Sequence, residues 1–435
     1  MAITDIVDLT ITIQDSAPKV ASFSTILILT YNAAAGMAGM QTFATGSAGL
    51  AALITAGLTT KHDAYRKLAA ISAQVPGVAS AKFFTRAAAN AQTITLTPTV
   101  TTAGTIYGPF AVNGTDVTYT VPGSATVASI VTALTTLIDA ITDVAAADST
   151  THVTVTPSAS AVRVYIDDCP RILTLKDTSA DAGIATDLGL AFAADEDFYA
   201  VLIDSQSEAE INAAGAWCLS NKRIGFFQTA DSIVWSASTT DVLSDLSGTT
   251  NHYAVVIPTR SMTGQACAAL PGKLLSYHPG SPTWALKTLE GVTADDWTGA
   301  EQGYIRAKHG IVYVDSAGIK HTLDGWATSG RFIDLTHGTD WLSAIMKAAV
   351  VKVMTDAVKV PYNLVGRAMI QQPIENSLAN ASSRSLIESG WTVTPPDLAL
   401  VSALDKTNRL MPDFTFQGIF TGAVHKAAIS GTLKA

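Results

Sequence analysis

Charged side chains are scarce in this sequence. Asp, Glu, Lys and Arg together make up 14% of its 435 residues, and hydrophobic residues make up 48%. A typical soluble protein carries about 25% charged residues. The net charge of −9 and the lack of any Lys- or Arg-rich run argue against direct nucleic-acid binding. A weakly charged surface suits a subunit that is buried between copies of itself, although a Thr- and Ser-rich soluble protein would have the same composition.

Cysteine is also rare, and no long apolar run is present. Cys169, Cys218 and Cys267 are widely spaced and odd in number, which favours a reducing compartment and neither a disulfide framework nor a CxxC metal site. The opening MAITDIVDLT carries acidic residues and no basic segment, so it does not resemble a signal peptide. No run of about eighteen apolar residues occurs, and we expect no membrane insertion.

Motifs that carry chemistry are missing as well. The sequence contains no GxGxxG, no GxxxxGK[ST], no GxSxG and no HExxH. Asp167-Asp168 and Asp295-Asp296 are adjacent carboxylates, and neighbours on an extended strand point to opposite faces, so neither pair predicts an acid–base dyad. We therefore expect no enzyme activity, no cofactor and no metal, although an active site need not announce itself by a local motif.

What the sequence does contain is strand patterning near both ends. Apolar residues alternate with polar ones over the first fourteen residues and again over Phe414–Phe420 and Ala427–Leu433. Period-two alternation predicts strands with one apolar face, which pair with a strand of the same chain or of another molecule. The residues expected to pair between subunits are Val7, Leu9, Ile11, Ile13, Ala427, Ile429 and Leu433. Phe414–Phe420 is expected to anchor the last hairpin in its own subunit.

An α/β core is predicted between these ends. The run over residues 23–30 (FSTILILT) is nearly continuous in apolar residues, as in a central strand buried on both faces. From Asp197 the pattern becomes strand, helix, strand, helix, strand, which implies a parallel sheet. Ser207, followed by Glu210, has the spacing of a helix capping box. An enzyme of this fold would place its site beyond the strand ends, and the alternative prediction is a site near Asp204, Thr229 and Thr259.

A Thr-rich block interrupts this core. Residues 92–190 predict a ββαββ arrangement, with Asn113-Gly114 as a two-residue hairpin turn and Ser124 as the cap of an amphipathic helix. Farther along, a long helix is predicted to begin at Thr339, and a second helix is predicted over 374–389.

These patterns predict an α/β fold class (α+β overall) in four parts. They are an N-terminal strand arm over 1–20, a discontinuous α/β core over 21–91 and 191–330, an inserted β-rich domain over 92–190, and a C-terminal domain over 331–435 with a terminal strand arm.

Three stretches resemble the contractile-tail sheath proteins of bacteriophages. They are GRFIDLTHGTDWLSAIMKAAVVKVMTDAVKVPYNLVG, LKTLEGVTADDW and PDFTFQGIFTGAVHKAAISGTLKA, in an order similar to that of the family. The Thr-rich block is similar in architecture to the inserted domain of a sheath-like subgroup. The resemblance covers residues 197–435 and, by their arm-like character, the first thirty residues.

The resemblance implies a structural subunit of a helical sheath. Many copies would polymerise around an inner tail tube, linked by their terminal arms, and the sheath would contract to drive the tube through a cell envelope during DNA delivery. It also implies baseplate and tail terminator proteins as partners, no catalytic residue, no cofactor, a place in the virion tail and assembly in the host cytoplasm.

Two further expectations follow from the resemblance. Lys347 and Lys352 are expected on an exposed helix face that could meet an acidic tube, although a solvated helix would look the same. Ser16-Ala17-Pro18 and Gly422-Ala423 are candidate hinges, with ordinary turns as the alternative. An inner tube protein and a surface adhesin are the other interpretations, disfavoured by chain length and by the opening residues respectively.

Overall fold

A computed structural model describes residues 22–31, 37–86, 91–158 and 163–426. The chain divides into two compact units. In the described residues, the larger unit spans 22–277 and 284–333, and the smaller unit spans 278–283 and 334–426.

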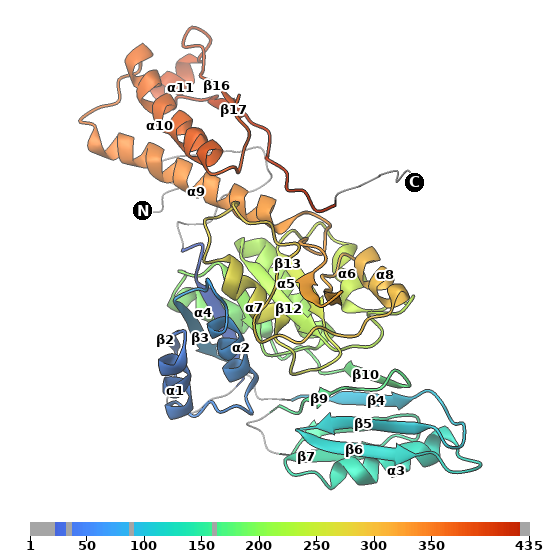
Figure 1. Cartoon of the computed structure of the whole chain (residues 1–435). Coiled ribbons are helices and arrows are strands. Elements are labelled where there is room, and N and C mark those ends of the chain that lie inside the picture. Colours follow the sequence, from blue (N-terminus) through green and yellow to red (C-terminus); the bar gives the residue numbers. More distant parts are fainter. Residues whose placement is uncertain (1–21, 32–36, 87–90, 159–162, 427–435) are drawn as a thin grey trace, which may run out of the picture. The chain divides into compact units, whose positions relative to one another are not determined.

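A six-stranded sheet forms the centre of the larger unit (Figure 1). Its order is β13-β12-β11-β1-β3-β2, and every neighbouring pair is parallel except the β2–β3 edge pair. The strands are β1 (Ile26–Thr30), β2 (Met40–Ala44), β3 (Ser80–Thr85), β11 (Ala200–Ile203), β12 (Ile224–Thr229) and β13 (Ala254–Pro258). The predicted α/β fold class and parallel sheet are confirmed. β1 is buried at all five positions, as its unbroken apolar run predicts.

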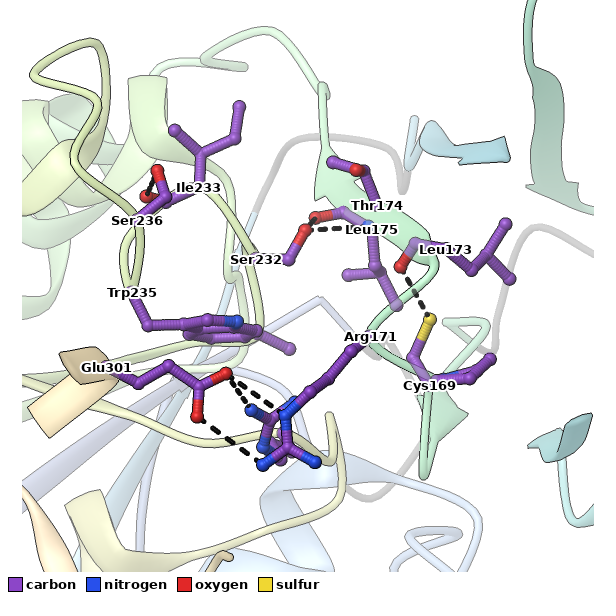
Figure 2. Close-up of a pocket in the computed structure, with 13 residues that line it drawn as sticks. Cys169, Arg171, Leu173, Thr174, Leu175, Ser232, Ile233, Trp235, Ser236 and Glu301 are labelled. Atoms are coloured by element: carbon purple, nitrogen blue, oxygen red, sulfur yellow. Dashed lines mark hydrogen bonds and ion pairs between the residues drawn. The ribbon is translucent and has the colours of Figure 1, made fainter. Parts of the chain in front are cut away.

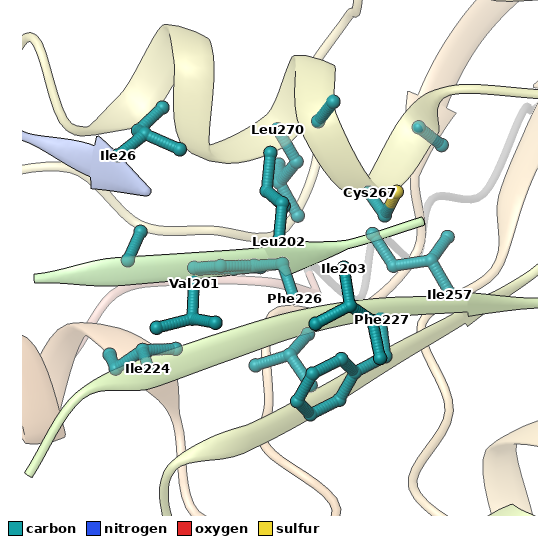
Figure 3. Close-up of a cluster of buried hydrophobic side chains, with 14 of the residues drawn as sticks. Ile26, Val201, Leu202, Ile203, Ile224, Phe226, Phe227, Ile257, Cys267 and Leu270 are labelled. Atoms are coloured by element: carbon teal, nitrogen blue, oxygen red, sulfur yellow. The ribbon is translucent and has the colours of Figure 1, made fainter. Parts of the chain in front are cut away.

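Helices pack on this sheet in two groups. Helix α2 contacts α7, and α5 contacts both α4 and α6. The helices are α1 (Ser47–Thr55), α2 (Asp63–Ser72), α4 (Ile184–Ala194), α5 (Glu208–Asn221), α6 (Val242–Ser247), α7 (Ala266–Leu274) and α8 (Gly299–Ala307). Figure 3 shows Cys267 and Leu270 of α7 against Leu202 and Phe226 of the sheet. A short hairpin, β14 (Tyr313–Ser316) and β15 (Ile319–Thr322), turns at Ala317-Gly318.

Two local features of this unit do not follow from simple sequence rules. α7 continues through Pro271 and Gly272, two residue types that usually interrupt a helix. Gly272 is needed there because a Cβ would lie 3.0 Å from the Cα of Ile71, where α2 and α7 approach closely. On α2, the charged side chain of Lys67 lies on the buried face and pairs there with Asp63.

The Thr-rich block folds into two sheets and a helix. The four-stranded sheet has the order β10-β4-β8-β7 and the three-stranded sheet β6-β5-β9. The elements are β4 (Ile94–Pro98), β5 (Ile106–Val112), β6 (Thr115–Thr120), α3 (Val127–Asp139), β7 (Val144–Asp148), β8 (Val153–Pro157), β9 (Ile166–Asp167) and β10 (Leu173–Asp177). Asn113 and Gly114 both have positive φ, as the predicted hairpin turn requires. The strand β7 was missed because VAAAD lacks alternation and has one β-branched residue, Val144, before three alanines.

The helix α3 begins two residues later than predicted. Thr126 is the N-cap and forms a capping box with Ser129, whereas Ser124 has a left-handed backbone (φ 63°).

The smaller unit is mainly helical. It contains α9 (Ile333–Asp356), α10 (Leu364–Ser383), β16 (Thr392–Thr394), α11 (Ala403–Thr407) and β17 (Thr415–Gln417). Both long helices start earlier than predicted. Thr339 lies inside α9 and does not cap it, and Asn363 caps α10 by accepting hydrogen bonds from the N–H groups of Val365 and Gly366.

Candidate functional site: strand pairing in the smaller unit and the closed edge of the sheet

The residues expected to pair between subunits lie outside the described residues. Val7, Leu9, Ile11 and Ile13 belong to the first 21 residues, and Ala427, Ile429 and Leu433 to the last nine. The candidate hinge Ser16-Ala17-Pro18 lies there too. The structure does show the segment that precedes the expected C-terminal arm.

That segment begins with an antiparallel pair of short strands. β17 pairs with β16, with Phe416 opposite Val393. Farther along, an isolated bridge joins Phe420 to Ile387, and Thr421 N–H donates to the carbonyl of Leu386 at 3.0 Å. Phe414–Phe420 is therefore anchored within its own chain, as predicted.

The side chains of β17 follow the predicted alternation. Phe414 and Phe416 are half-buried, while Thr415 and Gln417 are exposed. Within the described part of the chain, each of β16 and β17 has a single strand partner. A two-stranded sheet is marginally stable alone and leaves backbone donors and acceptors on its outer edges, so it gains stability when further strands are added.

The root of the C-terminal arm is held by a histidine that the sequence did not single out. Residues 422–426, including the candidate hinge Gly422-Ala423, have no regular secondary structure. His425 Nε2 lies 2.7 Å from Thr283 Oγ1. His425 also faces Asp334: burial raises the pKa of this carboxyl, and the histidine opposes the rise. No sequence pattern marks these contacts, because Thr283 and His425 are 142 residues apart.

The two lysines of α9 differ in exposure. Lys352 has 75% of its side chain exposed and pairs with Asp356 one helical turn away. Lys347 is 3% exposed, so its expected place on an exposed face is wrong. Helical spacing alone does not show which lysine of α9 is buried, because burial depends on segments that are distant in sequence.

The alternative enzymatic positions do converge at one edge of the sheet. Asp204, Thr229 and Thr259 follow β11, β12 and β13 at their carboxyl ends, but each residue is at most 8% exposed. Asp204 accepts hydrogen bonds from Thr30 Oγ1 and the Tyr31 N–H. Their polar groups therefore bind neighbouring segments of the same chain.

The inserted block covers part of this edge. The N–H of Met262 donates to the carbonyl of Ile166, and the N–H of Ser232 to that of Leu175. A cavity of about 300 Å³ remains where the two parts meet (Figure 2). At its mouth, Arg171 and Arg260 both donate to the carboxylate of Glu301.

A second polar group lies beneath the ends of β1 and β3. The Glu210 carboxylate accepts hydrogen bonds from the Tyr31 hydroxyl at 2.5 and 2.6 Å and from Arg86 at 2.7 Å. Arg86 also bonds to Asp187 at 2.8 Å. Burial opposes the charge of Arg86, but Glu210 raises its pKa above the ordinary value. These charges are paired with one another, which suits a structural role.

No group of three or more His, Cys, Asp or Glu in the described residues is arranged to hold a metal ion. None of the helices in that part of the chain is both long and apolar enough to cross a membrane.

Known proteins provide a further comparison. No protein-family model and no curated protein matches the sequence. Among solved structures, the sheath tail protein of Desulfitobacterium hafniense aligns with 89% of this chain and 93% of its own, at 11% identity and a TM-score of 0.48. The PVC sheath complex of an extracellular contractile injection system, in its contracted state, aligns over 98% and 97% at 9% identity and a TM-score of 0.48. The sheath tail protein of Listeria innocua aligns over 94% and 97% at 10% identity and a TM-score of 0.45. Likenesses at this level do not by themselves assign residue roles or a function to this chain.

Proposed function

We propose that this chain is a structural subunit of a contractile-tail sheath, in which terminal strands of one copy pair with strands of its neighbours. The observation that carries the proposal is the small β16–β17 sheet, from which the strand-patterned C-terminal segment departs. The sheet is anchored through Ile387 and Phe420, and the following segment is held at His425. The resemblance of three sequence stretches to sheath proteins supports the same role.

Strand addition is the physical basis of this assembly. A neighbour's arm would supply backbone hydrogen bonds to an open strand edge, and the alternating apolar residues Ile429 and Leu433 would fix its register. Such a contact joins different surfaces on the two copies, so it propagates into rings or helices and does not close a dimer. The low charge density of the sequence favours extensive burial between copies.

The finer assignments form part of the proposal. The partners would be an inner tail tube protein, a baseplate and a tail terminator, and contraction would serve DNA delivery from a virion tail assembled in a host cytoplasm. We also propose the arm over 1–20, the discontinuous core over 21–91 and 191–330, the inserted domain over 92–190 and the C-terminal domain over 331–435. Exposed Lys352 is the lysine of α9 that would meet the tube.

Electron microscopy of the concentrated, purified chain tests the assembly. Negative staining is expected to show rings or tubes for the full chain, and dispersed particles after deletion of Ala428–Ala435. The circular dichroism spectrum is expected to stay unchanged, because the deleted residues follow the β16–β17 sheet. An unfolded product would instead mean that the segment pairs within its own subunit.

A single substitution tests strand pairing without shortening the chain. Ile429→Pro removes a backbone donor and is expected to abolish assembly, since proline cannot continue a hydrogen-bonded strand ladder. Val424→Pro is the control, because Val424 is exposed and belongs to no strand. A monodisperse full-length chain at high concentration, or normal tubes from the Ile429→Pro variant, would contradict the proposal.

A further inference from the structure

The inserted domain shares its hydrophobic core with the α/β core. The buried cluster inside the inserted domain includes Ala230 and Met262, which belong to the loops that follow β12 and β13. Met262 is 4% exposed. An independently moving domain would complete its core with its own residues, so this shared packing couples the two parts.

Backbone hydrogen bonds continue across the same boundary. The Met262 N–H donates to the Ile166 carbonyl at 3.1 Å, and the Ser232 N–H to the Leu175 carbonyl at 3.0 Å. The Ser232 hydroxyl in turn accepts a 3.0 Å hydrogen bond from the Leu175 N–H. Strands β9 and β10 are therefore fixed in register against the loops of the core.

Charged contacts reinforce the boundary at one end, beside the cavity in Figure 2. Arg171 of the inserted domain and Arg260 of the core both bond to Glu301. Burial opposes the charge of Glu301, but hydrogen bonds from Thr298 and from both guanidinium groups lower its pKa to about 2. The Arg260 guanidinium lies 4.9 Å from the ring centre of Trp297, which holds it in place.

Two further charged residues of the inserted domain reach the core. Lys176 Nζ lies 2.7 Å from Glu208 and 3.7 Å from Asp231. The Asp167 carboxylate accepts hydrogen bonds from the Ser261 hydroxyl and from both the N–H and the hydroxyl of Thr263. Asp167, Arg171 and Lys176 therefore attach three separate points of the inserted domain.

The two linkers alone would leave the domain free to swing. The exit of the domain runs beside its entry, where the Thr178 N–H donates to the Thr93 carbonyl at 2.8 Å. Two adjacent linkers define a single hinge axis. We propose that the contacts of Asp167, Arg171 and Lys176 with the core form a clamp, which holds the inserted domain and the α/β core as one rigid body. The inference is independent of the sheath assignment.

Distance measurements between spin labels test the clamp in the full chain. Leu137 lies on α3 of the inserted domain, and Leu190 lies on α4, which packs on α5 as part of the core; both are exposed. Cysteines placed there would report the angle between the β-rich part over 94–177 and the core. The native thiols compete poorly for the label, because burial raises the pKa of Cys169 to about 12 and that of Cys267 to about 11, and Cys218 is buried with a raised pKa as well. Diluting labelled copies with unlabelled chain keeps the measured distances intramolecular.

One narrow distance distribution is expected for the doubly labelled parent. The triple variant Asp167→Ala, Arg171→Ala and Lys176→Ala is expected to broaden it by about twofold. The two partly exposed ion pairs contribute little singly, so they are removed together with the hydrogen bonds that Asp167 accepts. Arg306→Ala is the matched control: Arg306 and Arg171 both have side chains that are 47% exposed, but Arg306 pairs with Asp324 inside the core. A broad distribution in the parent, or an unchanged width in a folded triple variant, would overturn the proposal.

Discussion

Glu210 shows how a single carboxylate joins several elements of the larger unit. It lies in the first turn of α5 and accepts hydrogen bonds from Tyr31, Arg86 and the Ala182 N–H. The Tyr31 ring lies between the guanidinium groups of Arg86 and Arg163, at 4.1 and 4.8 Å from its centre. Burial raises the pKa of the Tyr31 hydroxyl, which keeps it protonated as a donor. The strand ends are thus joined by groups that a ligand would otherwise contact.

This network also explains why the predicted capping box of α5 does not form. Ser207 occupies the N-cap position, as the spacing predicts, but its hydroxyl donates to the Ser179 carbonyl at 2.5 Å. Glu210 is turned into the core. The spacing of Ser207 and Glu210 fits a capping box, but it does not reveal that the partners of Glu210 are residues distant in sequence.

Asp231 gives a pH prediction at the residue scale. Burial raises the pKa of this carboxyl to about 6, with a partly opposing effect from Lys176. The folded state therefore holds a proton that the unfolded state releases, and the stability from this group is present below about pH 4 and lost as the pH rises through about 6. Asp231→Asn removes the titration. The difference in free energy of unfolding, variant minus parent, is therefore expected to be about 2 kcal/mol larger at about pH 7.5 than at about pH 4.

Urea unfolding followed by tryptophan fluorescence measures this difference. The variant keeps an oxygen for the Ile233 N–H, which donates to Asp231 at 2.9 Å. Exposed Asp116→Asn is the control and should leave the pH dependence as in the parent. Parallel pH profiles for Asp231→Asn and the parent would show that Asp231 ionises normally in the folded state.

At the scale of elements, Gly338 allows α9 to pack closely against the segment that leads to β16. A Cβ at this position would lie 2.3 Å from Leu386 Cδ1, and Gly280 confines the same methyl group from another side. Gly338→Ala is therefore expected to destabilise the smaller unit by about 1–3 kcal/mol through overpacking, although alanine favours a helix by about 1 kcal/mol.

Thermal unfolding of Gly338→Ala, and of Gly338→Ala combined with Leu386→Val, measures how much of this destabilisation comes from the collision with Leu386. The smaller valine gives the new methyl group room, so the double variant should recover part of the loss. Gly366→Ala is not a suitable control, because a Cβ at Gly366 would collide with the backbone carbonyl of Pro361. Exposed Leu400→Ala is suitable. A stabilised Gly338→Ala variant would mean that Leu386 moves aside freely.

The elements also show which parts of the fold follow from the sequence. β1, the parallel strands after Asp197 and the Asn113-Gly114 turn were predictable, because each depends on a local apolar pattern or a backbone preference. The starts of α9 and α10 were not. Gly338 and Pro373 look like helix breakers, but in the structure both lie inside helices. Close packing requires the first, and only the tertiary structure reveals that.

In the candidate site, too, local patterns could be predicted from the sequence and contacts between distant residues could not. The anchoring of Phe414–Phe420 could be predicted from its alternation, whereas its partner β16 is a three-residue strand with no signal of its own. The Thr283–His425 contact and the burial of Lys347 depend on residues distant in sequence. Alternation identifies a strand but does not identify its partner.

For the whole molecule, two regions could mediate function: the carboxyl edge of the large sheet and the strand-patterned ends. They belong to different parts of the chain. The edge that holds ligands in many α/β proteins is here partly covered by the chain's own inserted domain, and Asp204, Thr229 and Thr259 are buried there. The open strand edges of the β16–β17 sheet lie in the smaller unit. Assembly through the arms should therefore not require the inserted domain.

Excision of the inserted domain tests this independence. A short Gly-Ser linker can join Thr93 to Thr178, because the N–H of Thr178 already donates to the carbonyl of Thr93. Met262→Ser is added so that the uncovered loop does not create an apolar surface. The shortened chain is expected to unfold at a lower temperature, since it loses the shared core and the clamp, but to retain its α/β core and to form rings or tubes on negative staining. The full chain with Met262→Ser alone is the control. A folded but dispersed shortened chain would show that the inserted domain supplies contacts between subunits and that the arms alone do not hold the assembly together.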